Sequence, residues 1–297
     1  MSGPRRVLAL LDGTLADPDA PLVRAGDLGL MRGDGVFETV LVEHAVAHEL
    51  DSHLERLARS AGLLGLPEPG AAAWRRCVAA AVAGWGSTAE LSLTLVCSRG
   101  MAADGSAGTC FAFGLPMSPR RVRLRETGVS ALALDRGVPL DVVDRAPWLL
   151  LGAKTLSYAV NMAAVRYAEE HGADDAIFTA PGGTVLEGPT SSLVVASGGT
   201  LRTTPAALGV LPGTTQRALF EEAEAGGWRV AEEPMSLDDL RAADGVFLTS
   251  AGHKVTRVHT LDGRPLPDSS ALAARLLGLL ERRYRKRATQ SRNAVIT

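Results

Sequence analysis

Lysine is scarce in this sequence, and Lys154 lies where an amine is most useful. Of the 31 Lys and Arg residues only Lys154, Lys254 and Lys286 are lysine, so the other 28 are arginine. A lysine amine can lose its proton and attack a carbonyl, whereas a guanidinium stays protonated at any workable pH. Lys154 follows the apolar run at residues 148–153, which would desolvate it, while the other two lysines have polar or charged neighbours. This pattern favours Lys154 as a nucleophile and proton carrier; the alternative is an ordinary lysine at the end of a buried segment.

Three further features could assist such an amine. Glu187 ends a predicted strand and precedes the small, hydroxyl-rich turn at residues 188–192. The segment Leu-Pro-Gly-Thr-Thr-Gln at residues 211–216 precedes a predicted helix, with a threonine expected at the N-cap, so its N–H groups and dipole could hold an anion. Arg56 lies off the apolar stripe of another predicted helix. Taken singly, Glu187 and Arg56 would be solvated surface residues. Together they supply the parts of a pyridoxal-phosphate site: an amine, a carboxylate for the pyridine nitrogen, and cationic groups for the phosphate.

The order and spacing of these segments carry a family resemblance. Residues 32–39, 53–57, 186–188 and 211–215, with Lys154 and the helix after it, match the fold-type IV pyridoxal-phosphate enzymes. This family includes branched-chain and D-amino-acid aminotransferases and aminodeoxychorismate lyases, and the resemblance runs from about residue 11 to residue 267. It implies a homodimer, pyridoxal 5'-phosphate as cofactor and Lys154 as the Schiff-base lysine and catalytic residue. The cofactor-binding residues that it implies are Arg56, Lys154, Tyr158, Glu187, Ser191, Ser192, Thr214, Thr215 and Ser250.

The resemblance also suggests a reaction. Residues 154–163 and 186–189 are most similar to the actinobacterial type of aminodeoxychorismate lyase, and Arg99 lies in a Ser-Arg-Gly segment found in lyases. Arg99 is therefore expected to bind a substrate carboxylate, with Arg257 and Ala251 as further substrate contacts; a surface-loop arginine is the alternative for Arg99. The expected function is elimination of pyruvate from 4-amino-4-deoxychorismate, which leaves 4-aminobenzoate for folate synthesis. Because Tyr158 is more typical of transaminases, an aminotransferase for D-amino or branched-chain amino acids is the alternative function. A homodimeric scaffold without activity is a third possibility, which Lys154 and Glu187 argue against.

The pattern of apolar residues predicts a mixed α/β fold of two domains. Strands are expected at residues 7–11, 35–42, 91–98 and 110–114, and helices at 53–64 and 71–85, in a smaller domain at 1–117. The prolines near residue 116 indicate a linker at 118–125. A larger domain at 126–297 is expected to carry the Schiff-base lysine, with the cofactor in a cleft between the domains.

Composition excludes several other classes of protein. A formal net charge of −2 gives no electrostatic basis for binding nucleic acid, and no apolar run is long enough to cross a membrane. The three cysteines, Cys77, Cys97 and Cys110, lie far apart without a C-x-x-C, which is typical of neither a disulfide framework nor a zinc site and suits a reducing cytoplasm. The histidines show no metal-ligand spacing. We therefore expect a cytoplasmic, metal-free enzyme with a small-molecule substrate.

Overall fold

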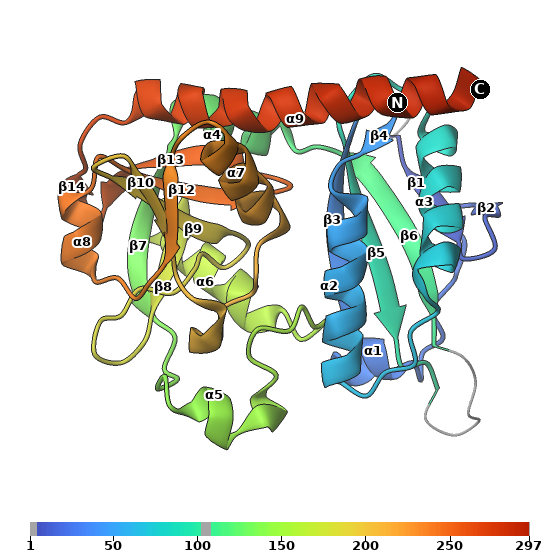
Figure 1. Cartoon of the computed structure of the whole chain (residues 1–297). Helices are drawn as coiled ribbons and strands as arrows, with labels where there is room; N and C mark the ends of the chain where they lie inside the picture. Colours follow the sequence, from blue (N-terminus) through green and yellow to red (C-terminus); the bar gives the residue numbers. More distant parts are fainter. Residues whose placement is uncertain (1–4, 102–107, 297) are drawn as a thin grey trace. The chain divides into compact units, whose positions relative to one another are not determined.

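The computed structural model describes residues 5–101 and 108–296, of which 291–296 are described by their backbone alone. The chain folds into two compact units (Figure 1). The described parts of residues 1–118, 153–158 and 284–297 form the first unit, and residues 119–152 and 159–283 form the second. Both units combine helices with a sheet, so the predicted mixed α/β fold is confirmed.

The first unit is built on an antiparallel sheet with strand order β2-β1-β6-β5-β3-β4. Its long strands agree with the predicted ones to within two residues, because alternating apolar side chains mark the face that packs on the core. The elements of this sheet are β1 (Val7–Leu10), β2 (Leu15–Ala16), β3 (Gly35–Glu43), β4 (Val46–Ala47), β5 (Leu91–Ser98) and β6 (Cys110–Pro116), with the short helix α1 (Leu28–Arg32) before β3.

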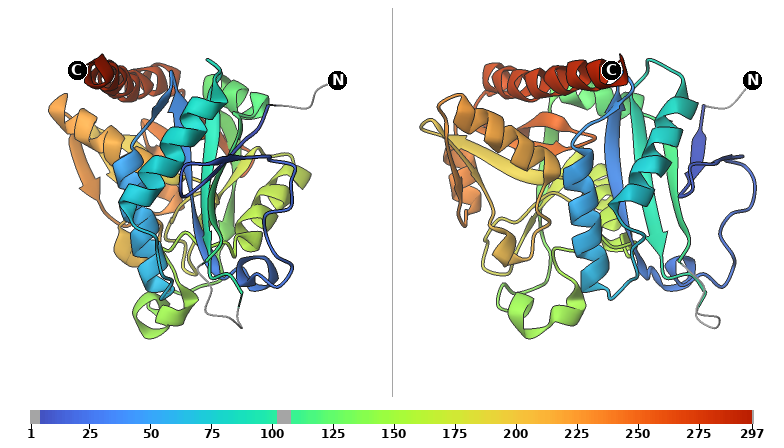
Figure 2. Two further views of the ribbon diagram at one scale, coloured as in Figure 1. Left: turned by 90° about the vertical axis from the view of Figure 1, so that its right-hand side faces the viewer. Right: turned by 45° about the vertical axis from the view of Figure 1, so that its right-hand side comes forward.

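Two helices, α2 (Leu50–Leu63) and α3 (Ala71–Trp85), cover one face of this sheet (Figures 1 and 2). The helices bury apolar side chains at helical spacing, including Leu54 and Leu57 of α2 and Trp74 of α3. These side chains pack in one core with those of alternate residues of β5, such as Leu93 and Leu95. The packed face holds β3 and α2 together, and both carry residues of the candidate site.

The segment that carries Lys154 belongs to the first unit, whereas the sequence predicted it in the C-terminal domain. The Leu156 N–H donates to Gly35 O over 2.8 Å, and the Phe37 N–H donates to Lys154 O over 3.1 Å. These hydrogen bonds join residues 153–158 to the beginning of β3. The backbone pairing therefore explains why the chain returns to the first unit here, which local sequence patterns do not reveal.

The second unit contains a mixed sheet with strand order β11-β10-β9-β12-β13-β7-β8, and β14 pairs with β13. The pairs β10–β11, β13–β7 and β7–β8 are parallel, and the others are antiparallel. The strands are β7 (Val129–Asp135), β8 (Asp175–Thr179), β9 (Ser192–Ser197), β10 (Thr200–Thr203), β11 (Arg229–Glu232), β12 (Gly245–Ser250), β13 (Lys254–Leu261) and β14 (Arg264–Pro265). The helices and helical turns are α4 (Pro119–Thr127), α5 (Val142–Arg145), η1 (Pro147–Leu149), α6 (Ala159–Glu170), η2 (Ala206–Leu208), α7 (Thr214–Ala225), α8 (Leu237–Ala242) and α9 (Ser270–Ile296), whose residues from Tyr284 onward are grouped with the first unit.

The predicted linker at residues 118–125 differs from the structure, because most of it lies in α4. Pro119 is the first residue of this helix, a position where a missing N–H costs nothing. The chain forms a hairpin after β8. The Phe178 N–H donates to Glu187 O, and the Ala180 N–H donates to Thr184 O, both over 2.8 Å. This hairpin fixes the backbone of Glu187 beside β8.

Candidate active site

Lys154 is buried in the first unit, with 9% of its surface exposed. Its Nζ lies 4.2 Å from the centroid of the Phe37 ring and 4.9 Å from that of Tyr158, and the two rings meet edge to face. The Lys154 N–H donates to the buried Ser60 Oγ over 3.1 Å. The amine is thus held among aromatic faces by a backbone that is hydrogen-bonded on both sides.

Burial alone does not distinguish Lys154 from Lys254. Lys254 is 6% exposed, although its neighbours in the sequence are polar, and it begins β13 with a left-handed φ of 51°. Lys286 is exposed on α9. The aromatic surroundings of Lys154, rather than its burial, support its assignment as the reactive amine.

Arg56 lies on α2 and makes a bidentate ion pair with Glu38 of β3. Its Nε donates to Glu38 Oε1 over 2.7 Å, and its Nη2 donates to Glu38 Oε2 over 2.8 Å. His53, one turn earlier on α2, places Nδ1 2.7 Å from the same Oε2. An ionised carboxylate only accepts hydrogen bonds, so Nδ1 carries the hydrogen. Glu38 therefore fixes the orientation of the Arg56 guanidinium.

The electrostatics of this cluster favour a charged Glu38 and a neutral His53. Burial raises the pKa of Glu38, but the charge and hydrogen bonds of Arg56 and His53 outweigh it, so that the pKa lies well below its usual range. Burial lowers the pKa of His53, and the Arg56 and Lys154 charges act in the same direction. The sequence interpretation assigned no role to Glu38 or His53, although both lie inside the matching segments at residues 32–39 and 53–57.

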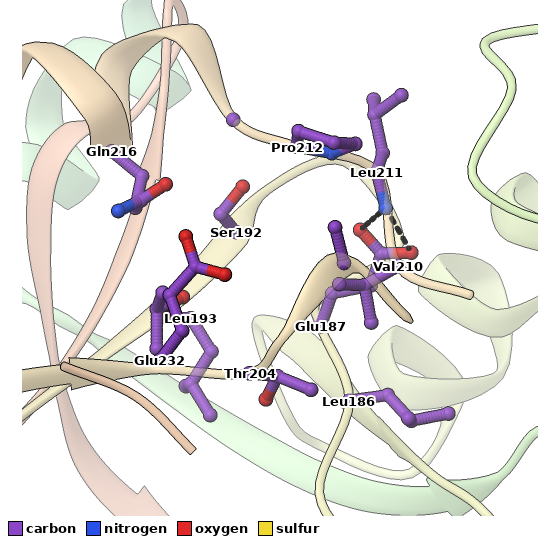
Figure 3. Close-up of a pocket in the computed structure, with 13 residues that line it drawn as sticks. Leu186, Glu187, Ser192, Leu193, Thr204, Val210, Leu211, Pro212, Gln216 and Glu232 are labelled. Carbon is purple, nitrogen blue, oxygen red and sulfur yellow. Dashed lines mark hydrogen bonds between the residues drawn. The ribbon is translucent and has the colours of Figure 1, made fainter. Parts of the chain in front are cut away.

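Glu187 in the second unit faces the segment before α7. Its carboxylate oxygens accept the Leu211 N–H over 3.1 and 3.2 Å (Figure 3). Arg136 is a further residue that the sequence did not single out: its Nη1 donates to Gly209 O over 2.9 Å, and its pKa is lowered by burial and raised by the charge of Glu187. The position of Arg136 directly after β7 was the only signal for it. The Glu187 carboxylate is therefore held against a backbone amide and near the half-buried Arg136.

A small hollow adjoins Glu187 in the second unit (Figure 3). Its lining includes Ser192, Gly213 and the buried Gln216 at the start of α7. The N-cap of α7 is Gly213 rather than the predicted threonine, and no side chain caps the helix. Thr214 and Thr215 are the first helical residues and are buried. The start of α7 therefore presents its positive end to this hollow, as anion binding requires.

Two observations test whether a phosphate-bearing cofactor fits here. The Ser191 Oγ is buried and has no hydrogen-bond partner among the described residues. A Cβ added to Gly213 would lie 2.2 Å from Ser192 Oγ, and one added to Gly188 would lie 2.3 Å from Ser191 Oγ. Glycine therefore lets the backbone approach these hydroxyl groups closely. A hydroxyl in need of a partner, a second hydroxyl and a helix N-terminus form a donor set that suits a phosphate.

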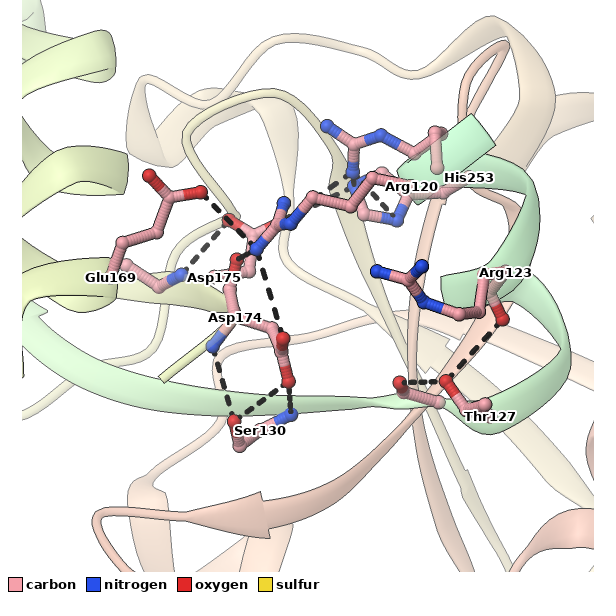
Figure 4. A network of polar contacts seen from close by, with 11 residues as sticks. Arg120, Arg123, Thr127, Ser130, Glu169, Asp174, Asp175 and His253 are labelled. Carbon is pink, nitrogen blue, oxygen red and sulfur yellow. Dashed lines mark hydrogen bonds and ion pairs between the residues drawn. The ribbon is translucent and has the colours of Figure 1, made fainter. Parts of the chain in front are cut away.

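Ser250 is the last residue of β12, and Ala251 follows it in the turn to β13. The His253 N–H donates to Ser250 Oγ over 3.1 Å, and the His253 ring lies 3.2 Å from Asp175 Oδ2 (Figure 4). Arg125 of α4 donates to Gly252 O over 2.8 Å. Burial lowers the pKa of His253. This buried network holds the turn.

The cross-strand partner of Ser192 on β12 is Thr249, the residue before Ser250. The Thr249 Oγ1 also donates to Ser192 O over 3.3 Å. The structure thus brings the predicted cofactor residues of the second unit to the ends of neighbouring elements. These residues are Glu187, Ser191, Ser192, Thr214, Thr215 and Ser250.

The two arginines predicted to bind substrate already have partners within the protein. Arg99 donates from Nε and Nη2 to Asp34 over 2.7 and 3.1 Å, and also to the backbone carbonyls of Leu64 and Gly65. Arg257 forms an ion pair with Asp268 and donates to the Thr127 carbonyl. A substrate carboxylate would have to share these guanidinium groups, so both substrate contacts stay predictions.

The first unit thus offers an amine among aromatic rings and an oriented guanidinium. The second offers a carboxylate against an amide, hydroxyl groups and a helix N-terminus. By their chemistry, these groups are of the types that pyridoxal phosphate requires: an amine for its carbonyl carbon, a carboxylate for its ring nitrogen, and hydroxyl groups with a helix N-terminus for its phosphate. In the described part of the chain, no group of three or more His, Cys, Asp or Glu side chains could hold a metal ion.

Comparison with known proteins supports this assignment. Residues 35–261 match the family described as amino-transferase class IV. The chain is 46% identical over 270 residues to the bifunctional aminodeoxychorismate lyase / D-amino acid transaminase of Mycobacterium tuberculosis, covering 88% of this chain and 93% of that protein. It is 27% identical to the D-alanine aminotransferase of Bacillus licheniformis, covering 86% and 89% of the two chains.

A solved structure described as a hypothetical aminotransferase from Mycobacterium tuberculosis, in its PLP-bound form, superposes with a TM-score of 0.89 at 43% identity. The superposition covers 93% of this chain and 98% of the other. The family match spans most of the sequence, and the likeness in fold is close. The chain therefore belongs to the class IV aminotransferase family and is a pyridoxal-phosphate-dependent enzyme of the fold-type IV class.

Proposed function

We propose that the protein is a 4-amino-4-deoxychorismate lyase, which eliminates pyruvate and leaves 4-aminobenzoate. The observation that carries this proposal is the 46% identity, over nearly the whole of both chains, to a bifunctional enzyme with this lyase activity. The 4-aminobenzoate would serve folate synthesis.

The residues of this chain would divide the work as follows. The bound cofactor supplies an electron-withdrawing ring that stabilises negative charge on the substrate. Lys154 takes the proton from the substrate α-carbon and returns it later. The aromatic rings around its amine keep water away during this transfer. Glu187 would keep the ring nitrogen of the bound cofactor protonated. Arg56, oriented by Glu38, would supply a positive charge for the phosphate, and the start of α7 would supply N–H donors.

An aminotransferase acting on D-amino or branched-chain amino acids is the second candidate. Tyr158, whose ring lies against Phe37 and near Lys154 Nζ, is the residue that favours it. The D-alanine aminotransferase and the second activity of the bifunctional relative point the same way. Both reactions begin with the same proton transfer at Lys154, so one protein could perform both.

A coupled assay separates the two candidates. 4-Amino-4-deoxychorismate is generated in place, with no amino acceptor added, and 4-aminobenzoate and pyruvate are both measured. Equimolar products that are absent with the Lys154→Ala variant would support the lyase. If the cofactor-loaded protein forms no product, the lyase is refuted. D-amino and branched-chain amino acids should then be screened with 2-oxoglutarate and pyruvate as acceptors.

We further propose a homodimer that works in the cytoplasm on a small-molecule substrate. Trp148 and Val160, 74% and 69% exposed on the second unit, offer apolar surface for a second copy. In the described part of the chain, no helix is long and apolar enough to cross a membrane. Size-exclusion chromatography with light scattering would test the dimer, and a monomer at micromolar concentration would refute it.

A further inference from the structure

Cys97 and Cys110 face each other directly across the strands β5 and β6 of the first unit. Hydrogen-bonded and non-hydrogen-bonded residue pairs alternate along an antiparallel pair of strands. At one end of this ladder the Ser98 N–H donates to Thr109 O over 3.0 Å, so the next pair inward, Cys97 and Cys110, is not hydrogen-bonded. The two cysteines therefore lie in the type of pair that brings side chains closest.

The other end of the ladder gives the same alternation of hydrogen-bonded and non-hydrogen-bonded pairs. The Met117 N–H donates to Glu90 O over 2.9 Å, and every second pair from there is hydrogen-bonded, which again leaves Cys97 and Cys110 between hydrogen-bonded pairs. In such a pair the Cα atoms lie about 4.5 Å apart, inside the range of about 4.4–6.8 Å that a disulfide spans. The backbone geometry therefore permits a bond between the two sulfurs without moving a strand.

The side chains are already oriented toward each other. The Cys110 Sγ donates to Cys97 Sγ over 2.7 Å. Cys97 is fully buried, whereas Cys110 is partly exposed. The third cysteine is separate, because Cys77 is buried on α3 and its Sγ donates to Ala9 O over 3.3 Å. Among the described residues, Cys97 and Cys110 are thus the one pair of thiols with the geometry to react together.

We propose that Cys97 and Cys110 form a reversible redox modification site, which a peroxide converts to an intramolecular disulfide. The Cys110 thiolate attacks the peroxide: an S–O bond forms, the O–O bond breaks, and the departing oxygen takes a proton and leaves as water. The Cys97 sulfur then attacks Cys110 Sγ, the S–S bond forms, the S–O bond breaks, and a second water leaves. The two thiols lose two electrons, which the peroxide gains, and a dithiol reverses the change.

The rate should depend strongly on pH. The hydrogen bond to Cys97 and burial raise the pKa of Cys110, so little thiolate is present at neutral pH. Because the thiolate is the reacting form, the rate should rise by about tenfold for each pH unit below that pKa. Slow oxidation at pH 7 and faster oxidation at pH 9 are therefore expected.

The disulfide would link β5 and β6 at the end of the sheet that also carries Arg99. Arg99 lies two residues after Cys97 and is held by Asp34 and by the Leu64 carbonyl. A covalent link between β5 and β6 would suppress opening of the ladder here, so exchange of the Ser98 amide hydrogen should slow. This inference does not depend on the proposed lyase activity, since it concerns the thiols alone.

Counting thiols in the holoenzyme tests the proposal. The protein is treated with hydrogen peroxide at pH 8, then denatured and labelled with N-ethylmaleimide. All three cysteines should take the label before oxidation, and Cys77 alone should take it afterwards. Before labelling, the oxidised protein should be lighter than the reduced protein by the mass of two hydrogens. Trypsin cleavage after Arg76 and Arg99 leaves Cys77 and Cys97 in one peptide, so the bridge is mapped in the Cys77→Ser variant. Dithiothreitol should restore all labels.

Matched variants make the outcome decisive. The bridge should persist in Cys77→Ser and be lost in Cys110→Ser, with Cys97→Ala as a second variant if that one folds poorly. Three labelled thiols after exhaustive oxidation of the wild type would overturn the proposal. A disulfide between two chains on a non-reducing gel, or addition of oxygen to Cys110 without a bridge, would overturn it as well.

Discussion

Replacing Glu38 by glutamine tests the most constrained part of the site. Glu38 is fully buried on β3 and accepts hydrogen bonds from Arg56 Nε, Arg56 Nη2 and His53 Nδ1. A glutamine has the same shape, but its amide offers one accepting oxygen and a donating NH₂ group. That NH₂ group would face an N–H of Arg56 or His53, and the Arg56 charge would lose its counter-ion.

The expected cost follows from the burial of the pair. Removing one partner of a buried ion pair costs about 3–5 kcal/mol, because the remaining charge stays buried without compensation. The Arg56 side chain is 11% exposed, so water can relieve part of this penalty. We therefore expect a loss of about 3 kcal/mol in the free energy of unfolding of the first unit, which is roughly a hundredfold change in the unfolding equilibrium constant.

Urea unfolding followed by tryptophan fluorescence would measure this loss. Trp74 and Trp85 are buried in the core of the first unit and report its unfolding. The matched control is Asp19→Asn, which breaks the exposed pair of Asp19 with Arg6 in the same unit and should cost less than about 1 kcal/mol. The affinity for pyridoxal phosphate should also fall, because Arg56 would lose its fixed orientation.

A double-mutant cycle decides whether the ion pair is the cause. If Glu38→Gln acts through the lost pairing, the same change in an Arg56→Met background should cost much less, with a coupling energy of about 2 kcal/mol or more. A loss below about 1 kcal/mol for Glu38→Gln alone, or additive losses in the cycle, would refute the reasoning.

Three further predictions follow from the site. Lys154→Ala should lower turnover by more than about 10²–10⁴-fold, which is the usual range for proton transfer alone. Lys154→Arg should be as inactive, because a guanidinium cannot give up a proton. Normal turnover by either variant in a steady-state assay would refute the assignment of Lys154 as the catalytic residue. Glu187→Gln should retain bound cofactor by absorbance yet lose at least about tenfold in kcat, or about 1.4 kcal/mol of transition-state stabilisation, and an unchanged kcat would contradict its role at the ring nitrogen. Burial lowers the pKa values of His53 and His253, so both side chains stay neutral in the folded protein. In the unfolded chain the same histidines take up protons below about pH 6.5. The free energy of unfolding must therefore fall as the pH drops below that value. Each histidine should contribute about a tenfold change per pH unit in the unfolding equilibrium constant until its folded pKa is reached; the contribution of His253 should vanish in His253→Gln, and an identical slope there would disprove it.

The sequence was most informative where short-range patterns determine structure. The strands and helices of the first unit follow from alternating and helical spacing of apolar residues, and α3 and β5 were predicted with the bounds that the structure has. The lysine could be singled out because so few cations are lysine. Its neighbour Phe37 and its backbone partner Ser60, however, lie more than 90 residues away along the chain, so no local pattern indicates them.

The parts that the sequence did not predict depend on long-range pairing. Residues 153–158 join the first unit through hydrogen bonds to β3, and the buried carboxylate that orients Arg56 comes from that same strand. The interpretation of Cys97 and Cys110 failed to pair them for a related reason: twelve residues separate them in the chain, and only the register of β5 and β6 makes them neighbours. Spacing along a sequence thus misses partners that a sheet brings together.

The hydrogen bonds of the backbone around the candidate catalytic residues explain why their side-chain types alone predicted the site only weakly. Lys154 has its N–H on Ser60 and its carbonyl on the Phe37 N–H, and the Glu187 carbonyl accepts the Phe178 N–H. Each functional side chain therefore projects from a main chain whose hydrogen bonds are already made on a strand or hairpin. A site that must hold reacting atoms within a fraction of an ångström needs such support. Lys254 is buried as well, so the assignment of Lys154 depends on the aromatic rings around its amine and not on burial alone.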